Sequence, residues 1–414
     1  MTSKRVVVTG VGMVTGLGHN VPDSWATALS GHSSIERLAT PYIERSAVRI
    51  GAPVKDWQAD KVLDARTARR TDRHQQFALV AAAEAVRQSG LQITDDNRER
   101  VSVMVAAATG GFLTYDENML SMAEHGNRRL NPFGIMMVLV NGAAAMLSIE
   151  YGAQGPSYAI VTACASGADN IGQAAAMIRA GVIDAAIAGS SETPITEMGL
   201  ACLDRISTLS RRNDLIQAAC APFDRDRDGL VLGEGAGIVV IESLETAQAR
   251  GATILAELIG YGASADAHHL TTPDETGAGG ARAIRRAVED AGIDPREVDY
   301  VNAHGTATRL NDVIETRAFK TVFGKSAYKV PISSTKPLTG HAMGATAAIE
   351  AIFCIQAIRE GMIPPTVNLL NPDPECDLDY TPLVARRLPV ETALTNSLGL
   401  GGHNATLIFR KFVA

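Results

Sequence analysis

The 414-residue sequence lacks several features that would place it in a specialised class. Its five cysteines form no CxxC pair and no metal-ligand spacing, so we expect no metal site, and the scattered odd set suits a reducing cytoplasm. Its longest apolar run, residues 135–149, is interrupted by Asn141 and is shorter than the roughly 20 residues of a membrane helix. The first residues lead straight into an expected strand, so we expect no signal peptide. These absences predict a cytoplasmic protein without a membrane segment.

An excess of basic residues is also missing. The formal net charge is −7, which argues against a nucleic-acid partner and means that an acidic partner would need a local basic patch. Hydrophobic residues make up 46% of the chain and charged residues 20%, the balance of an ordinary globular protein. We find no flexible linker and no low-complexity segment.

Short strand patterns alternate with alanine-rich helical patterns. Strands are expected at residues 5–10, 100–108, 157–163, 184–191, 237–243, 298–305, 329–336, 391–397 and 404–412. Helices are expected at residues 76–90, 166–181, 279–292, 312–324 and 342–361. This alternation predicts an α/β fold whose helices cover largely buried sheets.

The order of these patterns is similar before and after residue 250. The stretch around that residue is the one plausible seam, so we predict one compact unit made of an N-terminal half, residues 1–250, and a C-terminal half, residues 251–414.

Two motifs imitate ligand sites. The glycines near the start would form a dinucleotide fingerprint only if Thr15 were glycine. The aspartates between residues 224 and 228 imitate a calcium loop, but Glu234 comes one residue too early for the bidentate ligand. We interpret the first as a tight turn and the second as a structural turn held by salt bridges.

Cys164 lies where an expected strand meets an expected helix. Backbone N–H groups and the helix dipole at such a junction favour a thiolate, so a lowered thiol pKa is expected. Its neighbours Ala163, Ala165, Ser166 and Gly167 are small, so a substrate carbonyl could approach the sulfur. A packed core thiol is the alternative.

Further reactive side chains follow two later strands. His304 ends one strand, and Lys336 and His341 follow another. In open α/β sheets, sites form at the carboxyl ends of strands. One thiol and two imidazoles at matching strand ends are difficult to explain as packing, so we predict a shared catalytic site.

Five ordered motifs carry a resemblance to a known family: TACASG, DRDRDGLVLGEGAG, NAHGTAT, STKPLTGHAMGA and NSLGLGGHNATLIF. The chain resembles an elongating β-ketoacyl-acyl-carrier-protein synthase of the synthase II type, in the thiolase superfamily, almost end to end. The resemblance implies a thiolase-like five-layered αβαβα sandwich of two similar halves. It also implies a decarboxylative Claisen condensation of malonyl-carrier protein with an acyl group in fatty acid elongation.

The resemblance assigns roles to particular residues. Cys164 would be the nucleophile, and the N–H groups of Cys164 and Leu400 an oxyanion hole. His304 and His341 would stabilise the enolate, while Lys336 would pair with Glu350 in an electrostatic and structural role. Threonines would contact the phosphopantetheine arm: Thr271, Thr306 and Thr308. No metal or dissociable cofactor is required, although family members can hold a structural monovalent cation.

The chain departs from the family around the acyl pocket. Leu398 and Leu400 replace two phenylalanines, the second of which gates the pocket, and His403 stands where threonine is frequent. Thr109 occupies a pocket position that often carries isoleucine. Gly134, after Phe133, is smaller than the residue that is usual in this segment of the family. We therefore expect a divergent member with altered acyl-chain preference.

The resemblance also implies two protein partners, an acidic acyl carrier protein and a second copy of the chain. Four arginines spaced for one side of a helix could meet the carrier: Arg66, Arg69, Arg70 and Arg73. Other readings stay open at this point. They are a ketosynthase of a type II polyketide or aryl-polyene pathway, and a non-catalytic chain-length partner subunit, against which Cys164 argues.

Overall fold

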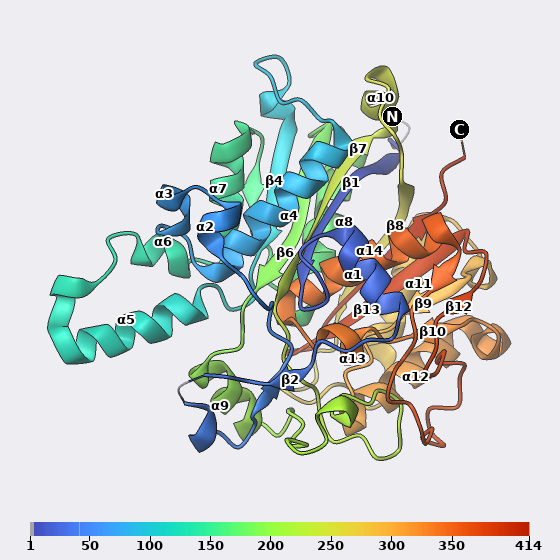
Figure 1. Cartoon of the computed structure of the whole chain (residues 1–414). Coiled ribbons are helices and arrows are strands. Elements are labelled where there is room, and N and C mark those ends of the chain that lie inside the picture. Colours follow the sequence, from blue (N-terminus) through green and yellow to red (C-terminus); the bar gives the residue numbers. More distant parts are fainter. Residues whose placement is uncertain (1–3, 41, 414) are drawn as a thin grey trace.

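The structure is a computed structural model that describes residues 4–40 and 42–413. Its ten main strands form one sheet in two runs of five (Figure 1). The first run is β1 (Val6–Thr15), β7 (Gly235–Ser243), β6 (Ala185–Glu192), β4 (Val101–Ala106) and β5 (Ser157–Tyr158). The second is β8 (Ala256–Ala265), β14 (His403–Arg410), β13 (Thr392–Gly399), β9 (Tyr300–Asn302) and β10 (Ile332–Ser333).

The two runs have the same topology. Numbered in chain order within each run, the first strand pairs antiparallel with the fifth, and the fifth pairs antiparallel with the fourth. The fourth strand pairs parallel with the second, and the second pairs parallel with the third. The runs join where Val7 and Val8 of β1 pair with Glu257 and Ala256 of β8. The boundary at residue 250 stays a prediction, but the sheet itself consists of two similar halves.

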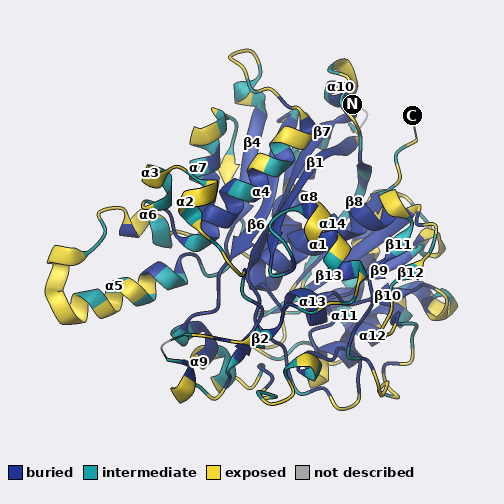
Figure 2. Cartoon of the chain, viewed as in Figure 1, coloured by how far each residue is buried: buried dark blue, intermediate teal, exposed yellow. Residues whose placement is uncertain are grey.

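Helices divide these halves into layers. On the outer side of the first half lie α4 (Arg73–Ser89) and α7 (Gly142–Tyr151), and α11 (Ala278–Ala291) and α12 (Arg309–Phe323) cover the second. Between the halves lie α8 (Ser166–Arg179) and α14 (Met343–Glu360), which contact each other and both runs of strands. Residues 343–358 of α14 are all buried, as expected for a helix that is apolar all round (Figure 2). The expected five-layered αβαβα arrangement is confirmed.

The outer helices pack closely in both halves because glycines face them. A Cβ added at Gly12 of β1 would lie 1.8 Å from the carbonyl oxygen of Ala81 in α4. A Cβ at Gly262 of β8 would lie 2.1 Å from that of Ala283 in α11. Both contacts are far below van der Waals distance, so these positions require glycine.

Shorter elements complete the chain. The helices are α1 (Val21–Leu29), α2 (Ala59–Val62), α3 (Ala65–Ala68), α5 (Phe112–His125), α6 (Gly134–Val138), α9 (Glu197–Arg205), α10 (Leu244–Ala249) and α13 (Lys336–Thr339). The strands are β2 (Glu36–Arg37), β3 (Ile50–Gly51), β11 (Met362–Ile363) and β12 (Arg386–Arg387). Figure 1 shows α5 extending away from the body of the molecule. Within the described ranges, no helix is both long and apolar enough to cross a membrane.

The expected buried strand at residues 157–163 is wrong in length and burial. Only Ser157 and Tyr158 form β5, and both are exposed. The reason is position, because β5 is the outermost strand of its half.

Candidate active site

Cys164 lies in a tight turn directly before central helix α8. The turn is the 3-10 segment Ala163–Ala165, and α8 begins at Ser166. Ala163 has φ +50°, a left-handed conformation that is unfavourable for a residue with a Cβ. The Ser166 hydroxyl donates to the Ala163 carbonyl over 2.7 Å and accepts the Thr162 N–H over 2.9 Å, which stabilises the turn.

His341 occupies the corresponding place in the second half. It lies two residues before α14, as Cys164 lies two residues before α8. Its Nε2 is 3.1 Å from the Cys164 Sγ, and its Nδ1 is 2.9 Å from the Thr346 Oγ1. The internal repeat therefore brings the thiol and this imidazole together across the central layer.

His304 completes the cluster from the end of β9. Its ring is nearly perpendicular to that of His341, at 86° and 5.4 Å between centroids. One ligand atom each of Cys164, His304 and His341 lies within 4.8 Å of the others. The backbone N–H groups of His304 and Gly305 donate to the buried Glu315 carboxylate over 2.7 and 2.8 Å, which holds His304 in place.

Burial dominates the electrostatics of the cluster. It lowers the pKa of His304 and His341 well below the usual value, with a further contribution from the Lys336 charge, so both imidazoles are neutral. Burial also raises the pKa of the Cys164 thiol to about 11, although the Leu400 N–H and the Lys336 charge oppose it. The expected lowering of the thiol pKa is therefore wrong, because desolvation outweighs the backbone N–H groups and the Lys336 charge.

The N–H groups of Leu400 and Cys164 both stabilise negative charge on the sulfur. Leu400 belongs to the loop between β13 and β14, which lies against the turn of Cys164. A Cβ at Gly399, the last residue of β13, would be 3.3 Å from the Cys164 nitrogen. The two N–H groups thus point to the same region, as an oxyanion hole requires, and this role stays a prediction.

Lys336 and Glu350 form a buried ion pair next to the cluster. The Lys336 Nζ is 2.6 Å from the Glu350 Oε1, and both side chains are 1% exposed. Burial raises the pKa of Glu350 to about 7 despite the attraction of Lys336. The structure therefore contains the ion pair that the resemblance implies, and its role in the site stays a prediction.

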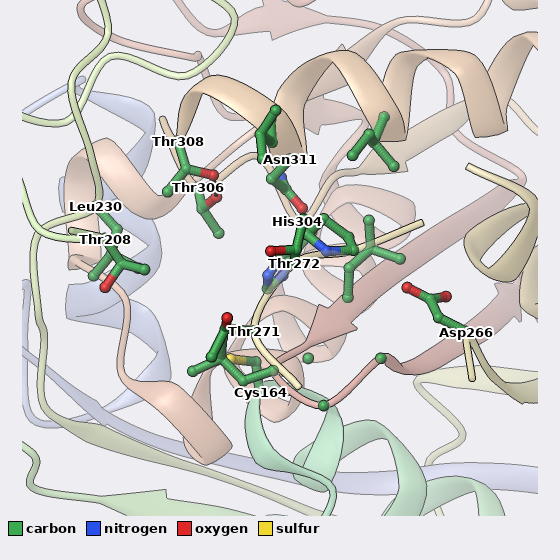
Figure 3. A pocket seen from close by; sticks show the side chains of 18 of the residues that line it. Cys164, Thr208, Leu230, Asp266, Thr271, Thr272, His304, Thr306, Thr308 and Asn311 are labelled. Carbon is green, nitrogen blue, oxygen red and sulfur yellow. Dashed lines mark hydrogen bonds between the residues drawn. The ribbon is translucent and has the colours of Figure 1, made fainter. Parts of the chain in front are cut away.

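A cavity of about 500 Å³ leads to the cluster (Figure 3). It brings together many residues predicted for the site, namely Cys164, Thr271, His304, Thr306, Thr308, His341, Leu398 and Leu400. The hydroxyls of Thr306 and Thr308 are 3.0 Å apart. The cavity has the size and mixed lining of a small-molecule channel.

Two predicted pocket residues do not line this cavity. The Thr109 hydroxyl donates to the buried Glu192 carboxylate over 2.7 Å. Phe133 is 37% exposed and lies 4.3 Å from the Arg70 guanidinium. Thr109 is held by a buried acid, and Phe133 precedes the outlying helix α6, so this chain alone places neither in the cavity.

The four arginines do not share one helix. Arg66 lies in α3, Arg69 and Arg70 follow it, and Arg73 begins α4 because Asp72 forms a capping box there. Arg73 contacts Glu234 at 3.2 Å and is not free for a partner. The sequence argument missed Arg128 and Arg129, which are exposed and lie near Asn131, whose side chain donates to the Arg69 carbonyl.

The sequence argument also missed the residues that hold two of the predicted catalytic residues in place. These are Thr346, which contacts His341, and Glu315, which holds the backbone of His304. Thr346 lies in the first turn of α14, the helix that follows His341, whereas Glu315 lies in the middle of α12, the helix that follows His304.

Comparisons with known proteins agree with this geometry. The chain matches the family models "Beta-ketoacyl synthase, N-terminal domain" over residues 3–247 and "Beta-ketoacyl synthase, C-terminal domain" over residues 255–370. It is 45% identical to 3-oxoacyl-[acyl-carrier-protein] synthase 2 of Staphylococcus aureus (strain N315), over 100% of this chain and 99% of the relative. The relative of the same name from Synechocystis sp. is 43% identical, with the same coverage.

Solved structures are similar over nearly the whole chain. One is a type II PKS acyl-carrier protein in complex with its ketosynthase bound to the hexaketide, with TM-score 0.91, 34% identity and coverage of 99% of this chain and 100% of that chain. Another is a beta-ketoacyl synthase from Burkholderia phymatum STM815, with TM-score 0.91, 33% identity and the same coverage.

Proposed function

The chain belongs to the β-ketoacyl synthase family, and we propose that it condenses malonyl-acyl carrier protein with an acyl group held as a thioester on Cys164. The product is 3-oxoacyl-acyl carrier protein, and the reaction elongates fatty acids. The observation that carries the mechanism is the 3.1 Å contact between the Cys164 Sγ and the His341 Nε2, with His304 beside it.

In the loading step, Cys164 attacks the thioester carbonyl of an acyl-carrier protein. At a thiol pKa of about 11 the sulfur holds its proton at neutral pH, so His341 Nε2 accepts that proton as the new bond forms. The negative carbonyl oxygen is stabilised by the N–H groups of Cys164 and Leu400. When the carbon–sulfur bond to pantetheine breaks, the departing thiolate takes the proton from His341.

In the condensation step, malonyl-carrier protein loses carbon dioxide. The electron pair of the broken bond becomes an enolate, and imidazole N–H groups of His304 and His341 donate to its oxygen. Neutral imidazoles can do this, and the Thr346 hydroxyl can donate to or accept from His341 Nδ1, so both tautomers are accommodated. The enolate carbon then attacks the acyl carbonyl, and the Cys164 thiolate leaves.

The direct test is intact mass after mixing with a medium-chain acyl-carrier protein. We expect one acyl adduct, absent in Cys164→Ala, that is discharged as a β-ketoacyl product when malonyl-carrier protein is added. If no acyl length loads Cys164, the proposed function is wrong, and the non-catalytic partner subunit takes its place.

Fatty acid elongation is better supported than a polyketide pathway. The curated relatives named as 3-oxoacyl synthases are 43–45% identical, and the polyketide ketosynthase structure is 34% identical. Altered chain preference remains part of the proposal, because Leu398 and Leu400 line the cavity. Loading rates across acyl lengths, compared with a Leu400→Phe variant, test it.

The carrier protein would meet an arginine patch at the outlying helices and extend its pantetheine arm into the cavity. The patch is Arg66, Arg69, Arg70, Arg128 and Arg129. The arm would contact Thr271, Thr306 and Thr308. An acidic carrier and a local basic patch are complementary on a chain of net charge −7. Charge reversal at Arg66 and Arg128 should raise KM for the carrier and weaken its salt dependence.

A homodimer would cover an apolar surface around α5, α6, α7 and β5. Figure 2 shows that most of α5 is exposed. Large hydrophobic side chains are exposed along these elements: Tyr115, Met119, Leu120, Met122, Ile135, Met136, Leu139, Ile149 and Tyr158. The elements that carry these side chains contact one another in series, α5 with α6, α6 with α7 and α7 with β5, and an exposed apolar surface is typical of an interface. Among the described strands β5 is at the end of the sheet, so its outer edge pairs with no other strand. Sedimentation of the full chain tests the dimer.

A cytoplasmic location and a structural monovalent cation complete the proposal. All five cysteines are free thiols, as in a reducing compartment. The buried Glu315 carboxylate, to which the Asn396 side chain donates over 2.8 Å, would supply oxygens to a cation. These oxygens suit a hard cation, and stability measured in potassium against a tetraalkylammonium salt would test its presence.

A further inference from the structure

The segment that imitates a calcium loop contains a buried arginine with an unusual set of contacts. Arg227 is 4% exposed. Its Nε donates to the carbonyl of Thr308 over 3.1 Å, and its Nη2 donates to that of Arg309 over 2.7 Å. Its Nη1 donates to the Asp224 carbonyl over 2.7 Å and to the Asp373 carboxylate over 2.6 Å. All three nitrogens of the guanidinium are thus used within the protein.

The first two contacts hold a strained loop. Ala307 has φ +63°, a left-handed conformation that favours glycine. On the other side of Ala307, the Thr306 N–H favours the charged form of Asp312, whose carboxylate is 3.6 Å from the Arg227 Nε. Arg227 and Asp312 therefore hold the backbone on both sides of Ala307.

The loop carries the two threonine hydroxyls that line the cavity. The Oγ1 atoms of Thr306 and Thr308 are 3.0 Å apart, and both residues lie beside the channel that leads to Cys164 (Figure 3). The other end of the loop has a separate anchor, because Glu315 accepts from the N–H of His304. The threonine end can therefore shift without moving the catalytic histidine.

We infer that Arg227 is a positioning residue for the pantetheine arm: it holds the strained loop at Ala307 so that the hydroxyls of Thr306 and Thr308 face the channel. The inference rests on the proposed function, since that function supplies the arm. The salt-bridged turn expected from the sequence thus has a role in substrate binding.

A lysine cannot replace this arginine. Guanidinium is planar and offers five N–H donors in fixed directions, which match carbonyls and carboxylates on several sides. Lysine keeps the charge opposite Asp312 and Asp373 but has three donors on one nitrogen, so it cannot reach both loop carbonyls and the two aspartates. Arg227→Lys therefore separates the geometry from the charge.

The test compares steady-state kinetics of Arg227→Lys with the unaltered full chain. We expect KM for acyl- and malonyl-carrier protein to rise about tenfold and kcat to change less than about threefold. The rate at which iodoacetamide alkylates Cys164 should not change, because that small reagent does not use the arm. A purely structural role would instead lower kcat, alkylation rate and melting temperature together, and this outcome or an unchanged KM would overturn the inference.

A second substitution tests the strain directly. Glycine adopts a positive φ without penalty. Adding Ala307→Gly to Arg227→Lys should therefore lower the raised KM at least threefold. No recovery would overturn the inference. If Arg227→Lys does not fold, Asp373→Asn gives the same comparison. This substitution removes the negative charge that pairs with Arg227, and Asp373 is partly exposed. Absence of acyl loading by the unaltered chain would overturn the proposed function itself, whereas normal loading with an unchanged variant KM overturns only the role of Arg227.

Discussion

Replacing Lys336 with methionine would remove the ammonium group but keep most of the side-chain volume of a pair that is closed to water. Glu350 would then be a buried carboxylate without its partner. Breaking a buried ion pair from one side costs about 3–5 kcal/mol. We expect a loss of unfolding free energy in this range at pH 8.

The loss should depend on pH with a defined sign. The folded-state pKa of Glu350 is about 7, above the ordinary value of 4.5, so its contribution to stability is present at low pH and is lost as pH rises through 7. Without Lys336 the folded pKa is higher still, and the folded chain keeps a proton that the unfolded chain has released. At 1.36 kcal/mol per pH unit, the variant should lose up to about 2.7 kcal/mol between pH 6 and pH 8.

Urea unfolding followed by circular dichroism at both pH values measures this. Lys320→Met is the matched control, because Lys320 pairs with Asp377 at the surface and should lose less than about 1 kcal/mol. The double variant Lys336→Met/Glu350→Leu should recover most of the stability and lose the pH dependence. A single variant that loses less than about 1 kcal/mol at pH 8, or the same amount at both pH values, would refute the reasoning.

Three further predictions concern the nucleophile, its histidine and the packing of the sheet. Alkylation of Cys164 by iodoacetamide should accelerate about tenfold per pH unit from pH 7 to 10, because the thiol pKa is about 11; a plateau near pH 8 would contradict this. Thr346→Val should slow condensation about tenfold with little change in KM, because His341 loses its Nδ1 partner, and Thr346→Ser should restore the rate. Gly262→Ala should lower the unfolding free energy by about 1–3 kcal/mol or more in urea titration, since its Cβ would meet the Ala283 carbonyl; an unchanged midpoint would exclude that contact.

The clustering of the three proposed catalytic residues was predictable because its signal is local. Cys164, His304 and His341 each follow a strand pattern and precede a helix pattern, and such ends gather at one edge of a sheet. The structure adds the reason why the thiol meets His341 in particular. Each lies two residues before the central helix of its half, and the two central helices are in contact.

The sequence argument failed in some places because a distant part of the chain decided the outcome, and in others because a local signal was weak or not recognised. Residues 157–163 are apolar enough for a buried strand, but their place at the sheet edge leaves β5 exposed. The sequence analysis also expected no strand at β8, because its glycines weaken the strand pattern. Yet β8 is the strand that joins the two halves of the sheet. The prediction that the four arginines lie on one helix failed for a local reason. The capping box at Asp72 starts a new helix, and this signal was not recognised.

By itself, the sequence determined the alternation of strands and helices, the two similar halves and the three reactive side chains at strand ends. These follow from periodicity, glycine positions and residue type, all of which act over a few neighbouring residues. Only the tertiary structure decided the charge states of the site, the closure of the Lys336–Glu350 pair to water and the contacts of Arg227 with the loop at Ala307. Desolvation and ion pairing depend on what surrounds a group from every side, and most of those neighbours are distant in the sequence.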